Sequence, residues 1–393
     1  MRSRFAFVLA MFVLFPVAAI AQLNGLQISE RQRANLLRAY PAADTNQDGE
    51  LNDSELAAAF QNRRNAATGA PRDFPVNPGW EGLQFPEDAV CYREPDAIAA
   101  IYGQQITSHP KPSDGSLRIV GTGHSFMAPG YKTLPLIVQA AGFGEQVMVT
   151  HTGGGITGSA RYKWEQENGI FQFAGRPKPK LLASISNAKW DAMMWGPYFN
   201  DRPEYYRCWI DFCLKYNPRM KFYLSDAWPQ LYQLGRIPKS ESELSAETIA
   251  RLGRERYVEY RDMLKGLSDD FPNKIFLLPT CDAMVLAADY YHRGELPGVK
   301  GIHQAIGKEE RSLWRDRLGH LGPGFERLEG YVFYATLYGK SPELIKQKIR
   351  YRASSDYPSP ELDRIFRKIA WEATISNPLT GVTDEDGDGM NDK

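Results

Sequence analysis

Short apolar runs alternate with amphipathic segments along most of the chain, and this alternation constrains the fold more than any other feature. The runs that we predict to be strands cover 117–121, 146–150, 191–195, 221–225 and 274–279. The segments that we predict to be helices cover 132–142, 180–187, 204–216, 245–267, 282–293, 325–338, 342–351 and 360–375. Such alternation predicts βαβ units, and therefore an α/β protein in which helices cover both faces of a parallel sheet.

The composition is that of a globular protein with balanced charge. The chain has 393 residues, of which 43% are hydrophobic, and its 47 basic residues equal its 47 acidic residues in number. Zero net charge argues against a nucleic-acid-binding protein, because phosphate binding needs a cationic surface. The length allows one large domain, or two, with small appendages.

The first 21 residues have the pattern of a secretory signal peptide. Arg2 and Arg4 precede an apolar run over 5–15, and Ala19 and Ala21 provide the small residues that a signal peptidase reads. The apolar run is too short to span a bilayer, and no later segment approaches that length. We therefore expect an exported protein, periplasmic or extracellular, with no membrane span after signal removal.

An acidic segment near the amino terminus matches the calcium loop of an EF-hand position by position. Residues 44–55 read DTNQDGELNDSE, with glycine at the sixth position and glutamate at the twelfth. Calcium takes several oxygen ligands, the glycine permits the sharp turn, and the closing glutamate can bind through both oxygens. Ca²⁺ is therefore the expected cofactor, and a solvated acidic turn is the alternative. The predicted ligands are Asp44, Asn46, Asp48, the carbonyl group of Glu50, Asn52 and Glu55.

The chain ends in a second acidic run, DEDGDGMND, over residues 384–392. Its alternating carboxylates resemble the first part of an EF-type or dockerin-like loop, but the closing glutamate is missing. The candidate ligands are Asp384, Asp386, Asp388 and Asp392. A flexible acidic tail is the equally weighted alternative.

Composition divides the rest of the chain into segments. We expect an EF-hand segment over 22–68 and a linker or wrapping segment over 69–114, which is rich in Pro and Gly at its start. The α/β domain should cover 115–352, a C-terminal helix should lie within 353–383, and the acidic tail covers 384–393.

Polar and glycine residues follow the predicted strands at the edge where an α/β sheet binds its ligands. Ser125 follows the first strand within GTGHSFM, three glycines at 153–155 follow the second, and Asn200 follows the third. The serine could be a nucleophile or a helix cap, and the glycine and asparagine N–H groups could bind an oxyanion. Asp316 and His320 lie four residues apart, so His320 could act as a base that Asp316 orients.

These blocks, in this order, resemble those of the SGNH (GDSL-like) hydrolases over roughly residues 115–345. The segment HLGPGFERLEGYVFYATLYGKSP also looks like the one that follows the catalytic histidine in bacterial members. The resemblance implies a three-layer α/β/α flavodoxin-like sandwich with a parallel sheet of about five strands. It further implies a serine esterase that removes acyl groups, often from carbohydrates. The resemblance implies Ser125 as nucleophile, with His320 as base and Asp316 as its partner. It implies three oxyanion donors: the backbone N–H of Ser125, an N–H of Gly154 or Gly155, and Asn200.

The chain also departs from the family's pattern. GHSF stands where GDS is usual, and one more residue than usual separates Asp316 from His320. His303 is a rival base, although Lys300 occupies the place of its aspartate. The function therefore has two readings: a secreted esterase that deacylates an acylated carbohydrate, or a non-catalytic calcium-dependent extracellular binding module.

Two further groups of residues leave alternatives open. The four cysteines, Cys91, Cys208, Cys213 and Cys281, allow three full disulfide pairings, and some could be buried thiols instead. Aromatic residues near the predicted edge of the sheet could stack on a sugar or could belong to the core. They are Trp195, Tyr198, Phe199 and Trp228.

Overall fold

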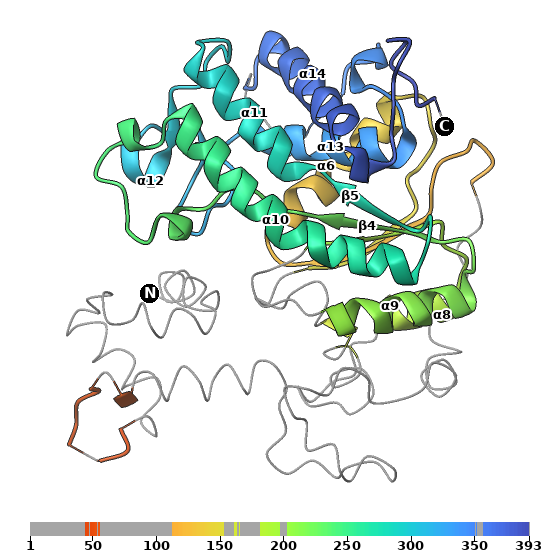
Figure 1. Cartoon of the computed structure of the whole chain (residues 1–393), viewed down its shortest axis with the longest axis horizontal. Helices are drawn as coiled ribbons and strands as arrows, with labels where there is room; N and C mark the ends of the chain where they lie inside the picture. Colours follow the sequence, from red (N-terminus) through yellow and green to blue (C-terminus); the bar gives the residue numbers. More distant parts are fainter. Residues whose placement is uncertain are drawn as a thin grey trace, which may run out of the picture. The chain divides into compact units, whose positions relative to one another are not determined.

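A computed structural model describes residues 44–46, 48–52, 54–55, 112–152, 161–162, 165, 181–196, 203–349, 351 and 357–392. The chain divides into two compact units, one of residues 1–92 and 163–179 and the other of residues 93–162 and 180–393. The second unit holds the sheet and the helices labelled in Figure 1. The predicted signal peptide, most of the EF-hand segment and most of the linker lie outside the described residues.

Five parallel strands form the central sheet, in the order β2-β1-β3-β4-β5. They are β1 (Ile119–Gly123), β2 (Met148–Thr152), β3 (Ala192–Trp195), β4 (Lys221–Ser225) and β5 (Ile275–Leu278). β1 and β3 are buried along their whole length, as is typical of interior strands of a parallel sheet. The α/β prediction is confirmed, and this strand order is that of a flavodoxin-like sheet.

Helices cover both faces of this sheet, which gives three layers. Figure 1 shows α8 (Leu181–Asn187) and α9 (Pro203–Tyr216) on one side, and α6 (Met127–Ala140) and α13 (Phe325–Tyr338) on the other. The remaining helices are α10 (Ala246–Asp270), α11 (Thr280–His292), α12 (Gln304–Gly307) and α14 (Pro360–Ser376). Of these, α10 and α14 both pack against α11, whereas α12 packs against a second, smaller sheet.

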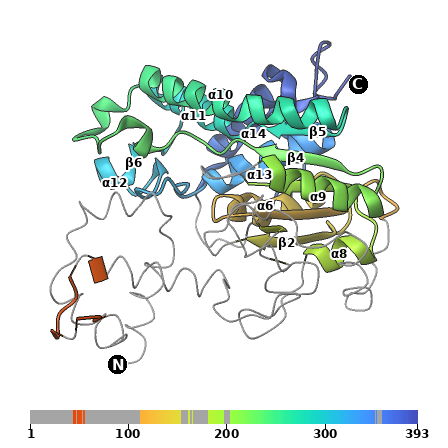
Figure 2. The same cartoon turned by 60° about the horizontal axis from the view of Figure 1, so that its bottom comes forward.

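A small second sheet was not predicted from the sequence. β6 (Gly301–His303) pairs in parallel with β7 (Ser312–Trp314), and both strands have only three residues. Figures 1 and 2 show β6 and α12 at the end of this unit away from α8 and α9. Strands this short have too few residues for an apolar period to be recognised.

The helix predicted over 342–351 is wrong. Only a 3-10 turn, Pro342–Leu344, forms there, and Ile345 has an extended backbone. Arg367 from α14 donates to the carbonyl oxygen of Ile345 at 2.8 Å, which provides that carbonyl with a partner other than a helical N–H. Buried Ile345 and Ile349 supply the four-residue spacing that imitates a helix.

The C-terminal helix and acidic tail belong to the same compact unit as the sheet. α14 packs against α13, and Ser359 caps its first turn by accepting a hydrogen bond from the N–H of Leu362. The tail pairs with the end of α13: the N–H of Ser341 donates to the carbonyl of Gly389, and the N–H of Asn391 donates to that of Gly339. Within the described residues, no helix combines the length and apolar character needed to cross a membrane.

Candidate active site

Ser125 lies in the turn between β1, which ends at Gly123, and α6, which begins at Met127. Gly123 has a φ of 149°, and a Cβ atom there would lie 3.2 Å from the backbone of Gly196 and 2.7 Å from Cγ of Met127. Only glycine therefore fits at this position, where the ends of β1 and β3 approach each other closely. The turn places the hydroxyl of Ser125 at the carboxyl edge of the sheet, the edge where such folds bind ligands.

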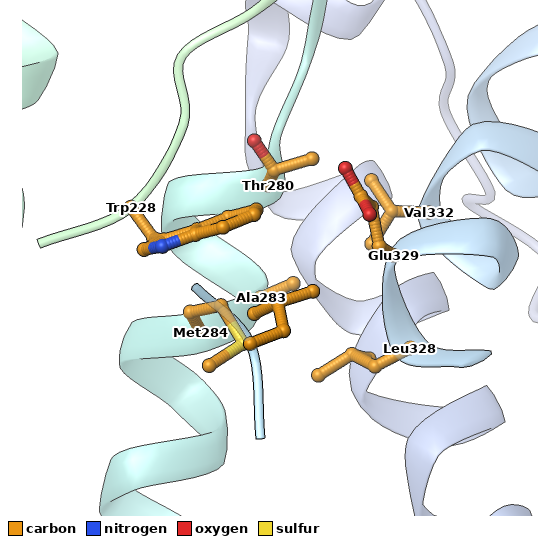
Figure 3. Close-up of a pocket in the computed structure, with 8 residues that line it drawn as sticks. Trp228, Thr280, Ala283, Met284, Leu328, Glu329 and Val332 are labelled. Carbon is orange, nitrogen blue, oxygen red and sulfur yellow. The ribbon is translucent and has the colours of Figure 1, made fainter. Parts of the chain in front are cut away.

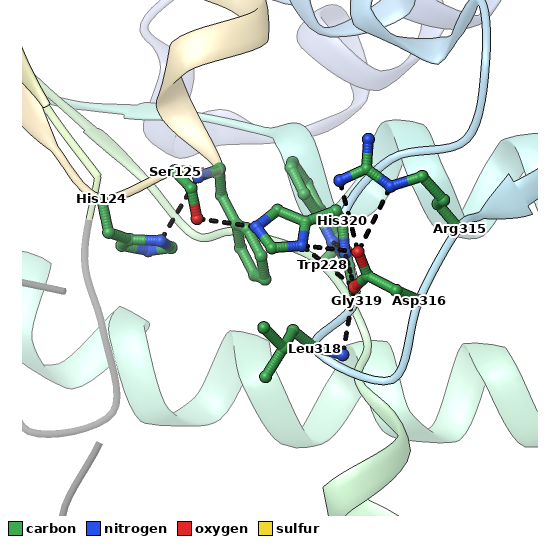
Figure 4. Close-up of polar contacts among 9 residues, drawn as sticks. His124, Ser125, Trp228, Arg315, Asp316, Leu318, Gly319 and His320 are labelled. Carbon is green, nitrogen blue, oxygen red and sulfur yellow. Dashed lines mark hydrogen bonds and ion pairs between the residues drawn. The ribbon is translucent and has the colours of Figure 1, made fainter. Parts of the chain in front are cut away.

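Ser125, His320 and Asp316 form a continuous hydrogen-bonded series (Figure 4). Oγ of Ser125 lies 2.7 Å from Nε2 of His320. Nδ1 of the same ring lies 3.0 and 2.9 Å from the two carboxylate oxygens of Asp316. Because a carboxylate only accepts, Nδ1 carries the proton and Nε2 is left to accept the serine hydroxyl proton.

The loop that carries the acid and the base closes on itself. The N–H of Arg315 donates to the carbonyl of His320 at 2.7 Å, and the N–H of Gly319 donates to that of Asp316 at 2.8 Å. An antiparallel bridge between Trp314 and Leu321 joins the two ends of this loop. These bonds explain how the unusual spacing of four positions still brings the carboxylate of Asp316 against the imidazole of His320.

The charge of Asp316 depends on opposing effects. Burial acts to raise its pKa, but the hydrogen bond and positive charge of His320 and the nearby guanidinium of Arg315 act in the other direction. The pKa of Asp316 is lowered to about 2 as a result. Asp316 is therefore a carboxylate at neutral pH, and it stabilises the imidazolium that forms when His320 takes a proton.

His303 does not occupy the position of the base. Its side chain is only 3% exposed and stacks over Trp314, and its Nδ1 has no hydrogen-bond partner within the described part of the chain. Burial lowers the pKa of His303 to about 4, although the negative charge of Asp316 acts in the opposite direction. His303 is therefore a neutral, buried neighbour of the acid–base loop, and His320 is the histidine in contact with Ser125.

Two of the three predicted oxyanion donors, Gly154 or Gly155 and Asn200, lie outside the described residues, whereas the third, the backbone N–H of Ser125, lies within them. The strands that lead to the first two flank β1 on both sides: Gly123 pairs with Thr152 of β2, and Thr122 pairs with Trp195 of β3. The roles of the three donors stay predictions.

The aromatic residues divide between the core and segments that are not described. Trp195 is fully buried and Trp228 is 1% exposed, so the interpretation of these two as a sugar-stacking surface is wrong. Tyr198 and Phe199 lie outside the described residues. Among the cysteines, Cys208, Cys213 and Cys281 form no disulfide within the described residues, and Cys91 lies outside them.

The acidic side chains of the loop 44–55 accept hydrogen bonds from the loop's own backbone. Asp44 accepts hydrogen bonds from the N–H groups of Asp48 and Gly49, and Gly49 has the positive φ, 84°, that the sharp turn needs. Glu55 closes the loop by accepting from the N–H groups of Asn52 at 3.1 Å and Asn46 at 3.2 Å. The hydrogen bond from Asn52, with those from residues 45 and 46, lowers the pKa of Glu55 against the effect of burial.

The other predicted ligands of this loop also lie along it. The side chains of Asn46 and Asp48 accept from backbone N–H groups two residues ahead, and Asn52 accepts from Ser54. Glu50, whose carbonyl is the predicted ligand, donates its own N–H to Asp48. The calcium site in this loop stays a prediction, based on oxygen ligands of the type that calcium takes.

The acidic tail brings three of its four candidate ligands together. Carboxylate oxygens of Asp384, Asp386 and Asp388 all lie within 4.8 Å of one another. Asp384 also accepts from the indole N–H of Trp371 at 2.8 Å, which fixes the loop to α14. Asp392 instead accepts a hydrogen bond from the N–H of Glu385. Asp384, Asp386 and Asp388 are thus the residues that could hold a cation, and Asp392 closes the loop.

Two buried acids near the site have no signal in the sequence. Asp226 follows β4 and is 1% exposed, and burial raises its pKa, as does the charge of Asp282. Glu329 of α13 accepts from the N–H of Gly130 in the first turns of α6 at 2.7 Å, and burial raises its pKa well above the usual range. Figure 3 shows Glu329 at a small cavity that Trp228 also lines. A short polar residue directly after a strand, such as Asp226, indicates a turn, so the sequence gives no reason to expect it to be buried.

No family model and no curated protein matches this chain. Among solved structures, it is similar to the crystal structure of a DUF4886 family protein from Bacteroides uniformis. The two chains share 13% sequence identity with a TM-score of 0.44, over 69% of this chain and 98% of that one. The resemblance to SGNH hydrolases therefore remains a prediction from the sequence blocks.

Proposed function

We propose that this protein is an exported SGNH-type serine esterase that deacylates an acylated carbohydrate. The contact of Ser125 with His320, and of His320 with Asp316, is the observation that carries the proposal. A serine hydroxyl, a histidine base and an orienting carboxylate in this order are the machinery of acyl transfer on several unrelated folds. The carbohydrate as substrate follows from the family resemblance alone.

In the proposed reaction, Ser125 attacks the ester carbonyl while its proton passes to Nε2 of His320. The carbon–oxygen bond to the alcohol then breaks, and His320 gives that proton to the departing alcohol. Water next attacks the acyl-enzyme, again losing a proton to His320. The bond between the acyl carbon and Oγ of Ser125 then breaks, and His320 returns that proton to Oγ as the acid is released. Asp316 keeps Nδ1 protonated throughout and stabilises the imidazolium.

The oxyanion of each tetrahedral intermediate needs hydrogen-bond donors at the same edge of the sheet. In this proposal they are the backbone N–H of Ser125, an N–H of Gly154 or Gly155, and the side-chain amide of Asn200. Each such donor is worth about 3 kcal/mol of transition-state stabilisation. Replacing Asn200 by Ala would test its share without changing the residues that transfer the proton.

Calcium would have a structural role in this proposal. The residues of the loop 44–55, and Asp384, Asp386 and Asp388 in the tail, offer the oxygen ligands that calcium prefers. A bound ion would supply charge to hold these loops closed. It takes no part in the proton transfers, which the three residues of the active site complete among themselves.

A fluorophosphonate probe tests the proposal without knowledge of the natural ester. Oγ of Ser125 should form a bond to phosphorus as the phosphorus–fluorine bond breaks, and the serine proton should pass to His320. We expect the full chain to be labelled at Ser125 and to hydrolyse aryl acetates and acetylated glycans. Ser125→Ala should do neither, whereas Ser242→Ala, at an exposed serine, should behave as wild type.

Equal background rates in the wild type and in Ser125→Ala would contradict the esterase proposal. They would favour the second reading, a calcium-dependent binding module without turnover. Labelling at Ser125 with hydrolysis of aryl acetates but not of acetylated glycans would support the esterase activity and contradict the carbohydrate substrate.

A further inference from the structure

The turn that follows β4 has a strained backbone close to the candidate site. Ala227 has a φ of 55°, in the left-handed region that residues with a Cβ rarely adopt, and it is 3% exposed. Its N–H donates to the hydroxyl of Ser225 at 3.1 Å, and its carbonyl lies 3.0 Å from the hydroxyl of Thr280. Strain persists only where the surrounding structure enforces it, and it gathers at functional sites.

Asp226 connects this turn to the start of α11. Its Oδ1 lies 3.0 Å from the hydroxyl of Thr280 and accepts from the N–H of Cys281 at 2.8 Å. The hydroxyls of Ser225 and Thr280 are themselves 2.8 Å apart. The start of α11 and the end of β4 thus hold Ala227 in its unusual conformation through a buried network.

The turn sets the direction in which the side chain of the next residue, Trp228, points. Its indole N–H donates to the carbonyl of Gly319 at 2.6 Å, and Gly319 immediately precedes the base. Its ring stacks on Phe126 with centroids 4.8 Å apart, and Phe126 meets the ring of His320 edge-on at 5.2 Å. Figure 4 shows Trp228, Gly319 and His320 together at the site.

We propose that Trp228 is a positioning residue, which holds the loop of His320 so that the base meets Ser125. The inference rests on the proposed function. Trp228 contacts the loop at the peptide before His320, and it supports Phe126, the residue after Ser125, on its ring face. One side chain therefore contacts both segments whose separation sets the distance between the nucleophile and the base. Such distances matter because a misplacement of about 1 Å can cost on the order of 10²-fold in rate.

A matched pair of substitutions separates positioning from ordinary core packing. Trp228→Phe keeps a stacking ring and removes the N–H that reaches Gly319. Trp190→Phe makes the same change at another buried tryptophan, whose indole N–H donates to the carbonyl of Ser184 at 2.8 Å. Trp190 precedes β3 and so lies at the amino edge of the sheet, away from the site.

Two measurements are made on the full chain of each variant. The first is the rate at which a fluorophosphonate labels Ser125, resolved into binding of the probe and the chemical step. The second is the low-field proton resonance of the Nδ1–H of His320, identified by its loss in His320→Gln. The resonance reports the bond to Asp316 whether or not the protein turns over a substrate.

We expect both variants to fold and to lose similar thermal stability. Trp228→Phe should slow the chemical step of labelling by about tenfold or more, without weakening probe binding, and should shift or broaden the resonance. Trp190→Phe should leave both unchanged. The proposal fails if Trp228→Phe retains the wild-type rate and resonance, or if Trp190→Phe alters them equally.

A second variant covers the case in which Trp228→Phe does not fold. Ala227→Gly removes one methyl group and relaxes the restriction on φ, and glycine accepts this conformation without strain. We expect it to fold, with a smaller change in the same two readouts, because the turn then directs Trp228 less firmly. If the wild type is not labelled at all, the esterase proposal fails. The resonance in Trp228→Phe and Ala227→Gly still decides whether Trp228 positions His320.

Discussion

The two edges of the central sheet differ in how their polar groups are arranged. At the amino edge, Arg118 binds the carboxylate of Asp191 through Nε at 3.0 Å and Nη2 at 3.1 Å. The backbone N–H of Arg118 donates to the same carboxylate, and the N–H of Trp190 donates to the side chain of Asn217. The hydroxyl of Ser116 is an exception, since it is buried there without a partner in the described part of the chain.

At the carboxyl edge, buried polar atoms stand without partners at the ends of three strands. They are Oγ1 of Thr122 near the end of β1, Nε1 of Trp195 at the last residue of β3 and Oδ2 of Asp226 just after β4, each judged within the described residues. The strained Ala227 lies at this edge too. Unpaired buried groups and strain cost stability, and proteins retain them mainly at functional sites. The paired groups of the amino edge stabilise the fold, whereas the carboxyl edge keeps unpaired buried groups and backbone strain beside the candidate site.

The largest expected effect that tests this comparison comes from Asp316→Asn at the carboxyl edge. An amide can donate to Nδ1, so the imidazole would place its proton on Nε2 and could no longer accept from Ser125. The rate of fluorophosphonate labelling should fall on the order of 10⁴-fold. Asp191→Asn makes the same change at the amino edge and should label at the wild-type rate. Equal rates in the two variants would remove the functional difference between the edges.

Next in size is the loss of stability expected from Asp191→Ala. The substitution leaves the guanidinium of Arg118, 8% exposed, without its carboxylate. Removal of one partner from such a pair should lower the free energy of unfolding by about 3 kcal/mol, measured by urea denaturation. Asp262→Ala breaks an exposed pair with Arg261 and should cost at most about 1 kcal/mol. A smaller loss from Asp191→Ala than from Asp262→Ala would show that the amino edge is not where stability lies.

The titration of His303, which lies beside the acid–base loop, should make the free energy of unfolding decrease in acid. The folded-state pKa is about 4, below the ordinary value of 6.5, so the unfolded chain takes up the proton first as the pH falls. The contribution to stability is therefore lost between about pH 6.5 and pH 4. Unfolding free energy should decrease by about 2 kcal/mol from pH 7 to pH 5 through this residue.

His303→Asn should flatten that part of the pH profile, because it removes the titrating ring. Asp316 does not contribute to this pH dependence. Its pKa is lowered to about 2, so its protonation reduces stability only below about pH 4. A wild type and a His303→Asn variant with parallel profiles between pH 7 and pH 5 would argue against a neutral buried His303.

The smallest expected effect concerns calcium in the acidic tail, which pairs with the end of α13 near the amino edge. Tyr338 at that end of α13 accepts from the N–H of Leu117, the residue two before β1. Calcium at several times its Kd should raise stability by about 1 kcal/mol, with a higher melting temperature than in chelator. Asp388→Asn should remove the part of this rise in stability that comes from the tail, and Glu55→Gln should remove the part that comes from the loop 44–55. Neither should alter the labelling of Ser125, and a melting temperature insensitive to calcium would contradict both calcium sites.

Much of the sheet can be predicted from sequence because its signals are local. The strand over 221–225 has the bounds that the apolar pattern predicts, and the helix over 325–338 does as well. α6 begins five residues before its predicted start at 132, and its first turns contain Pro129 and Gly130, residue types that are common in loops. Proline is tolerated in the first turn of a helix, where its missing N–H has no partner to lose.

Part of the candidate site can likewise be predicted from the sequence, and part of it cannot. The order of Ser125, Asp316 and His320 is visible in the sequence, and the structure brings the three side chains into contact. The left-handed Ala227 and the burial of Trp228 depend on groups from β4, α11 and the acid–base loop, which are distant in sequence. No local pattern encodes such contacts, so the sequence alone placed Trp228 among possible substrate contacts.

Ser125 and His320 are separated by 195 positions along the chain. Closing a loop of this length costs chain entropy, so the contact depends on the rest of the domain being folded. A chain that stops before His320, or that has not yet docked α13 on α6, has the nucleophile without its base. Reactivity of Ser125 would therefore report completed folding, and a partly folded chain would be harmless to the esters around it.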